Sequence, residues 1–373
     1  MGSERLTIDT ERLRDDIFKM KKYFSKSPRA DDIRNDYCSF LTLVLMYENI
    51  TDEKIDTSDI FINPKKARKI LNYENERDNV RFREFLEKYF SDIASVLLQF
   101  YVRGDGKNIM DMPFYSVMRK YNKKDFTDII LDYFSKYGIR EERIAKKYFM
   151  ENRIQNGVYM DEGLGYLVNC VMNKSGYIFT SYKELDSFCQ SIIVHELGHA
   201  IDDEVFAFPQ YKKLGKCDVL TEVPSTFFEI GFAFFLKDQN IDRDGSIIII
   251  NDIIRRIMET AEGVKLIINE QVKNGRVVLE DGGYAVIDDE TLSLIDIITY
   301  GLSYYISFYL QCMLDGDYKG FMKRFYNFLT TRGELSLEEG IETLGINYDD
   351  FMESNKLISK VKENTIELKK RFK

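Results

Sequence analysis

Both histidines of this 373-residue chain, His195 and His199, lie in one short segment, SIIVHELGHAIDD. They are four residues apart, so on a helix they project from the same face. Glu196 lies between them, and the preceding residues FCQSIIV are nearly all apolar. Such a helix is expected to be largely buried, where polar groups without partners are costly. The fold must therefore bring other polar groups to this face.

Two imidazoles at this spacing can bind one zinc ion, with Glu196 beside the water that the ion would activate. The same pattern occurs by chance in proteins without metal, but the absence of histidine elsewhere in the chain favours a metal site. We predict one zinc ion per chain, held by His195 and His199, with Glu196 as general base. Asp202 and Asp203 follow too closely to bind the same ion easily and are predicted to orient the histidines.

A zinc hydrolase needs three protein ligands and one open position. Because no histidine remains, the third ligand must be a carboxylate or a thiolate, and the best candidate is Glu222 in VLTEVPSTFFEIGFAFFL. Thr221 is expected to cap this helix, with Pro224 in its first turn. Glu229 lies seven residues on, on the same face, and is predicted to accept a hydrogen bond from a ligand histidine. The alternative is that either glutamate only caps the helix or pairs with a lysine.

Composition narrows the class of protein. The five cysteines are scattered without CxxC pairs, which is typical of free thiols in a reducing compartment. The N-terminus lacks the apolar region of a secretion signal, and no apolar run reaches the ~18 residues of a membrane span. The net charge of −9 argues against binding to nucleic acid. We expect a soluble cytoplasmic protein with neither membrane nor nucleic acid as a partner.

Apolar periodicity predicts a mainly α fold. Residues 5 to about 150 are expected to form successive amphipathic helices, the N-terminal helical lobe. Glycines separate short β-prone runs over residues 157–182, which predicts a small sheet or hairpin beside the motif helix. Residues 151–373 are then predicted to form a catalytic lobe, with helices at about 186–204, 221–237 and 246–273. A hairpin is expected to turn at Asp281 and Gly282. Further helices are expected from Leu292, and one of them is predicted to begin with a capping box at Ser336 and Glu339.

The motifs HELGHA and EVPSTFFE resemble those of the oligopeptidase family of thimet oligopeptidase and oligoendopeptidase F, in which HExGH is followed by a glutamate in an E-x-P-S context. The segments GYIFTSYKELDSFCQSIIV and FYNFLTTRGELSLEEGIETLGINYDDF are also similar to that family, so the resemblance runs from about residue 160 to near the end. It implies a bilobal helical zinc-metallopeptidase fold, and endopeptidase action on short peptides through a zinc-activated water.

The resemblance further implies tyrosines that hydrogen-bond the transition state from a downstream helix, here DIITYGLSYYISFYLQCML. Tyr300 and Tyr304, which share a face, are the favoured candidates, with Tyr305 in reserve. Packing in an aromatic core is the alternative for each of them. The sequence departs from the family here, because better-known members have two working tyrosines about two turns apart and a nearby histidine. The residue seven after Tyr300 is Ser307, and no third histidine exists.

Substrate main chain is predicted to pair with an edge strand within residues 176–181. The residues expected to form this strand are Gly176, Tyr177, Ile178 and Phe179. Two other functions stay open: a zinc aminopeptidase, which would need an acidic anchor for the substrate amine, and a peptide-binding or regulatory protein of the same fold with little turnover. Nothing in the sequence predicts the oligomeric state.

Overall fold

The computed structural model describes residues 5–25, 34–57, 95–104, 118–159, 165–168, 176–205, 220, 222–269, 271–273, 276–278, 284–285, 290–314, 318–331, 335–353 and 355–371. The chain divides into two compact units, residues 1–80 with 119–204 and residues 81–118 with 205–373. This division differs from the predicted boundary at residue 150. The reason is that the small sheet packs with the N-terminal helices, as set out below.

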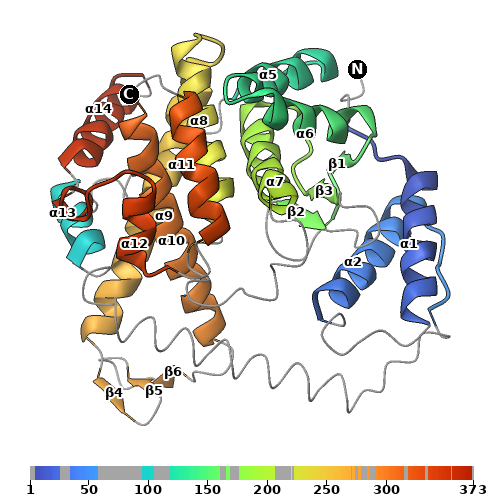
Figure 1. The fold of residues 1–373 in the computed structure, drawn as a ribbon, viewed down its shortest axis with the longest axis horizontal. Helices are drawn as coiled ribbons and strands as arrows, with labels where there is room; N and C mark the ends of the chain where they lie inside the picture. The colour runs from blue at the N-terminus through green and yellow to red at the C-terminus, as the bar shows by residue number, and fades with distance from the viewer. Residues whose placement is uncertain are drawn as a thin grey trace. The chain divides into compact units, whose positions relative to one another are not determined.

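The first unit combines helices with a three-stranded sheet (Figure 1). The described N-terminal residues form helices, as their amphipathic periodicity predicts. The elements of the first unit are α1 (Thr10–Phe24), α2 (Arg34–Thr51), α5 (Lys123–Ser135), α6 (Ile139–Met150), β1 (Ile154–Asn156), β2 (Gly165–Val168), β3 (Tyr177–Thr180) and α7 (Ser187–Val205).

The sheet has the strand order β1-β3-β2. β1 runs parallel to β3, with Ile154 opposite Ile178, and β2 runs antiparallel to it, with Tyr166 opposite Phe179. The prediction of a small sheet is confirmed, but β3 lies in the middle rather than at an edge. The parallel pair joins segments separated by β2 in the sequence, which a hairpin pattern does not reveal.

One face of this sheet is covered by the N-terminal helices α1 and α2. Tyr177 and Phe179 of β3 belong to the same buried apolar cluster as Leu13 and Phe40. The Tyr177 hydroxyl donates a hydrogen bond of 2.8 Å to Asp16, a carboxylate that is only 1% exposed and would be costly to bury without a partner. The N-terminal helices are therefore part of the structure that holds the strands.

The second unit is helical, with a small antiparallel sheet of its own (Figure 1). Its elements are α8 (Val223–Asp238), α9 (Arg243–Asn269), β4 (Gln271–Lys273), β5 (Arg276–Val278), β6 (Tyr284–Ala285), α10 (Glu290–Met313), α11 (Tyr318–Thr331), α12 (Leu337–Thr343), α13 (Tyr348–Glu353) and α14 (Asn355–Arg371). The predicted hairpin is formed by β5 and β6, while its turn at residues 281–282 lies outside the described residues. The predicted capping box at Ser336 and Glu339 is confirmed.

Helices α8, α9 and α10 pack against one another. The approach of α9 to α10 depends on Gly301, because a Cβ there would lie 1.8 Å from the Thr260 Oγ1. Helix α10 is buried all round over residues 301–310, which a hydrophobic stripe on one face would not predict. This close packing gives the helix that begins beside Glu222 a fixed support.

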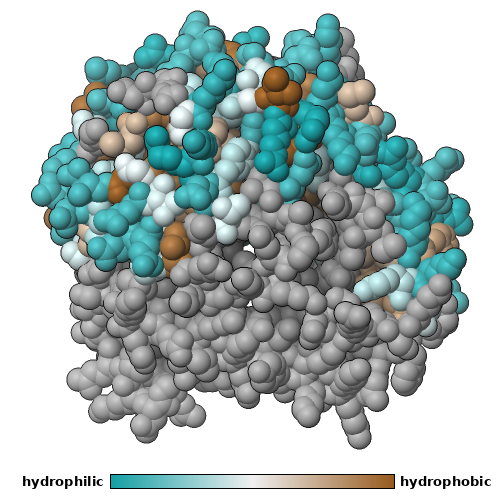
Figure 2. Space-filling view, in the orientation of Figure 1, coloured by the Kyte–Doolittle hydropathy of each residue, from teal (hydrophilic) through white to brown (hydrophobic). Residues whose placement is uncertain are grey.

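The described surface that Figure 2 shows is mostly hydrophilic, with hydrophobic residues scattered over it. Among the exposed apolar side chains, Ile139 and Met150 lie at opposite ends of α6, and Val102 lies elsewhere in the chain. Among the described residues, no helix combines the length and the apolar composition that crossing a membrane requires.

Candidate metal centre

Helix α7 carries the histidine motif and begins directly after Asp186, whose carboxylate caps the helix. Asp186 accepts hydrogen bonds from the backbone N–H groups of Phe188 at 3.0 Å and Cys189 at 2.9 Å. Burial raises the pKa of the Asp186 carboxyl group despite these bonds. Ile193 and Leu197, on another face of the helix, are fully buried. The cap and the buried face together fix the direction in which the motif side chains point.

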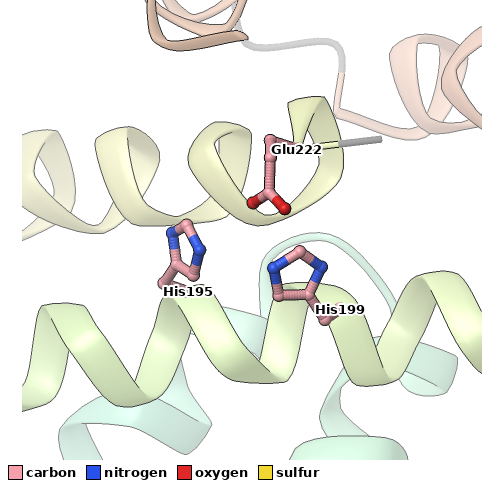
Figure 3. Close-up of side chains that lie close together, drawn as sticks. All are labelled: His195, His199 and Glu222. Carbon is pink, nitrogen blue, oxygen red and sulfur yellow. The ribbon is translucent and has the colours of Figure 1, made fainter. Parts of the chain in front are cut away.

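Three side chains singled out by the sequence come together. His195, His199 and Glu222 each offer one potential ligand atom, an imidazole nitrogen or a carboxylate oxygen, and these three atoms lie within 4.8 Å of one another. Figure 3 shows both imidazoles on α7 pointing toward the Glu222 carboxylate, which comes from the segment that starts α8. Asp202, on the same helix, is buried and Asp203 is half-buried, and their part in orienting the histidines stays a prediction.

Glu222 is itself the N-cap residue of α8, and its side chain makes no capping hydrogen bond. The predicted cap, Thr221, lies outside the described residues. The Ser225 hydroxyl donates to the Glu222 carbonyl oxygen at 2.9 Å and lies 3.1 Å from its Oε2. This hydroxyl therefore contacts the carboxylate from the first turn of the helix.

The first turn of α8 is held by the hydroxyl group of Ser307 in α10. Ser307 donates a hydrogen bond of 3.0 Å to the Val223 carbonyl oxygen, and its Oγ lies 2.7 Å from the Thr226 Oγ1. Ser307 is the residue at which the sequence departs from the resembled family. Its contacts place the start of α8, and hence the backbone of Glu222, at a defined position against α10.

The donor set fits a zinc ion. Two imidazole nitrogens and one carboxylate oxygen form the His₂Glu set of several catalytic zinc sites, with zinc–ligand distances of about 2.0–2.2 Å. Tetrahedral ligand atoms at those distances lie about 3.5 Å apart, so the three side chains would close by roughly 1 Å around an ion. Three protein donors leave one position open, which distinguishes a catalytic site from a closed structural one.

The predicted tyrosines of α10 occupy different environments. Tyr304 is 2% exposed, and its hydroxyl donates a hydrogen bond of 2.9 Å to Glu229 Oε2. Burial and the Glu229 carboxylate raise the pKa of Tyr304 well above its usual value. Tyr305 is fully buried and donates to the Phe351 carbonyl oxygen at 3.2 Å. Both therefore pack in the core of the second unit, whereas Tyr300 is 41% exposed.

Glu229 has a partner that the sequence did not indicate. The guanidinium group of Arg256 lies near the Tyr304–Glu229 pair, and Arg256 Nη1 is 3.4 Å from the Tyr304 hydroxyl oxygen. Arg256 also pairs with Asp252 at 3.0 Å. This chain of polar groups joins α8, α9 and α10. The predicted hydrogen bond from a ligand histidine to Glu229 stays a prediction.

We expect Tyr304→Phe to lower the free energy of unfolding by about 1–3 kcal/mol, because it removes the donor from a buried carboxylate. Tyr300→Phe, at an exposed position, is expected to change it by less than about 0.5 kcal/mol. Urea denaturation of both variants measures the difference. Equal stabilities of the two variants would contradict the core position of Tyr304.

The residues predicted to bind substrate main chain, Gly176 to Phe179, cannot offer a free edge. Residues 177–180 form β3, which pairs with β1 on one side and β2 on the other. The prediction of an edge strand there is wrong. The strand on the β2 side starts at Gly165, where a Cβ would lie 3.0 Å from the Glu196 Oε1. The signal for this contact is a glycine at the start of a β-prone run, which often marks a close approach.

Comparison with known proteins agrees on the architecture. No protein-family model matches the chain, and no curated protein matches it in sequence. The fold is that of mainly helical peptidases.

Among solved structures, the chain is similar to a protein assigned as oligoendopeptidase F from Bacillus anthracis str. Ames, with 11% identity, a TM-score of 0.54, and coverage of 95% of this chain and 73% of that one. A second protein assigned as oligoendopeptidase F is 12% identical, with a TM-score of 0.54 and coverage of 96% and 75%. Pz peptidase A, solved with an inhibitor, is 12% identical, with a TM-score of 0.51 and coverage of 97% and 75%. The resemblance stated from the motifs is thus confirmed for the fold.

Proposed function

We propose that the protein is a zinc metallo-endopeptidase of the oligopeptidase type that hydrolyses short peptides. The observation that carries the proposal is the convergence of His195, His199 and Glu222 within 4.8 Å, with Glu196 next to the first of them on α7. The solved structures of similar fold include proteins assigned as oligoendopeptidase F. Fold and donor set therefore support the same reaction class.

The residues of the chain divide the chemistry between them. His195, His199 and Glu222 would hold a zinc ion, which when bound supplies a water of lowered pKa and polarises the substrate carbonyl. Glu196, 6% exposed, accepts the proton of the attacking water and passes it to the leaving amine. Tyr300 is the candidate, among the three tyrosines named, for a hydrogen bond to the oxyanion, since Tyr304 and Tyr305 donate within the core.

The alternatives differ in what they require of the site. A peptide-binding protein with little turnover needs no general base, so Glu196 beside two imidazoles favours an enzyme. An aminopeptidase would require the free amine of its substrate, whereas an endopeptidase accepts peptides with a blocked N-terminus. Substrate length and end groups therefore separate the three functions.

The test is cleavage of a quenched peptide library with acetylated N-termini, with and without phenanthroline. We expect turnover that the chelator abolishes and that added zinc restores, because the three ligands bind the ion reversibly. Cleavage that requires a free N-terminus would identify an aminopeptidase instead. Peptide binding without any chelator-sensitive cleavage would support the binding protein and contradict the proposed function.

A further inference from the structure

The Glu222 carboxylate lies at the start of α8 but does not cap the helix. Glu222 is the N-cap residue, and an N-cap side chain ordinarily accepts a hydrogen bond from the backbone N–H of the second or third helical residue. Here the second residue is Pro224, which has no N–H, and no capping bond to the side chain forms. Figure 3 instead shows the carboxylate directed toward the imidazoles of His195 and His199.

The third helical residue contacts this carboxylate through its side chain. Ser225 is fully buried, and its hydroxyl lies 2.9 Å from the Glu222 carbonyl oxygen and 3.1 Å from Glu222 Oε2. A hydroxyl has one hydrogen, so it can donate fully to only one of these two oxygens. Which oxygen needs this donor depends on the other contacts of the carbonyl group.

The Glu222 carbonyl oxygen has two donors from the next residue. It accepts a hydrogen bond from the Thr226 N–H at 3.0 Å and lies 2.8 Å from the Thr226 hydroxyl, which can donate to it. These two donors match the two lone pairs of a carbonyl oxygen. The Ser225 hydroxyl is therefore available to the carboxylate, and a hydrogen bond to an ionised acceptor is roughly twice as strong as one between neutral groups.

We propose that Ser225 is a positioning residue for the metal ion: its hydroxyl donates to Glu222 Oε2 and holds the carboxylate in the orientation that faces the two histidines. Pro224 supports the same orientation, because it removes a backbone donor that would draw the carboxylate to the helix terminus. The inference rests on the proposed function for the identity of the ion. It deepens that function by naming the residue that orients the third ligand.

Ser225→Ala tests the positioning through zinc affinity, which requires no turnover. Alanine is the best helix former, so α8 should still form, and urea unfolding of the metal-free protein checks this. We expect the zinc dissociation constant, measured by competition with a chromophoric chelator, to rise by about 10- to 100-fold. An unchanged dissociation constant would overturn the proposal. A variant that no longer folds would also overturn it, because Ser225 would then be needed for the helix itself.

Ser246→Ala is the matched control. Ser246 is also fully buried, and its hydroxyl donates to the Ala233 carbonyl oxygen at 2.7 Å. The substitution therefore removes a buried hydroxyl from the same unit without removing a bond to a carboxylate. We expect the zinc affinity of this variant to equal that of the unchanged protein. A comparable loss of affinity in both variants would assign the effect to general destabilisation and contradict positioning by Ser225.

A double-mutant cycle tests whether Ser225 acts through the carboxylate. In a Glu222→Ala protein no carboxylate remains at position 222, so adding Ser225→Ala should change the zinc dissociation constant by less than about twofold. A further loss of about tenfold or more in that background would overturn the proposal, because Ser225 would then act on the ion by another route.

The positioning and the proposed function fail in different ways. A protein whose zinc affinity depends on Ser225 but which cleaves no peptide contradicts the endopeptidase and supports the positioning. A protein that cleaves peptides with chelator sensitivity, but whose Ser225→Ala variant binds zinc equally well, contradicts the positioning alone.

Discussion

Glu196→Gln is expected to lower kcat for peptide cleavage by about 10²–10⁴-fold while zinc stays bound. The amide has the shape of the carboxylate but cannot accept the proton of the attacking water. Glu196 is not one of the proposed metal ligands, so the substitution should not reduce zinc binding. The measurements are kcat for the best library peptide and the zinc content of the purified protein.

Glu204→Gln is the matched control on the same helix. Glu204 pairs with Arg143 at 2.7 Å on the surface, an interaction typically worth about 0–1 kcal/mol, and its loss should leave kcat nearly unchanged. If the protein with Gln at position 196 cleaves as fast as the unchanged protein, Glu196 is not the base and the proposed mechanism is wrong.

Glu222→Ala is expected to weaken zinc binding by more than about 100-fold. Loss of a residue that only hydrogen-bonds to a metal ligand typically weakens binding by up to about 100-fold, and loss of a ligand itself should cost more. The reason is that the variant retains two of the three donors that converge. Competition with a chromophoric chelator measures the dissociation constant. Zinc should also stop raising the thermal midpoint of this variant, because ligand stabilisation follows affinity.

The metal-free proteins provide the control for this variant. The Glu222 side chain makes no capping hydrogen bond, and the start of α8 is held by Ser307. We therefore expect the metal-free Glu222→Ala and unchanged proteins to unfold at similar urea concentrations. Zinc affinity equal to that of the unchanged protein would show that Glu222 is not a ligand.

Local signals in the sequence predicted the elements that carry the candidate site. The predicted helix at 186–204 is observed as α7 at Ser187–Val205, and that at 221–237 as α8 at Val223–Asp238. Both are apolar, and Pro224 lies in the first turn of α8 as predicted. The convergence of Glu222 with the histidines was predicted because a catalytic zinc ion needs a third protein ligand. This requirement holds however far apart the ligands lie in the sequence.

What the sequence did not reveal depends on packing between distant segments. The central position of β3 comes from its parallel pairing with β1, for which no short pattern exists. Tyr304 and Tyr305 lie on different faces of α10, yet both are buried because three helices surround them. The close approach of Gly165 to Glu196 joins a strand to a helix, a contact that the glycine alone does not predict. Periodicity indicates which residues share a face but not what covers that face.

The contact between Asp16 and Tyr177 has a consequence for how the chain can be divided. A fragment that begins at residue 151 would retain every motif of the proposed active site but lose α1, α2 and the carboxylate on which Tyr177 depends. The side chains of Tyr177, Phe179 and Val168 would then face solvent. Strand β2, which contacts Glu196 through Gly165, would lose the helices that pack against its sheet. Helices α1 and α2 therefore belong to the structural unit that carries the histidine motif.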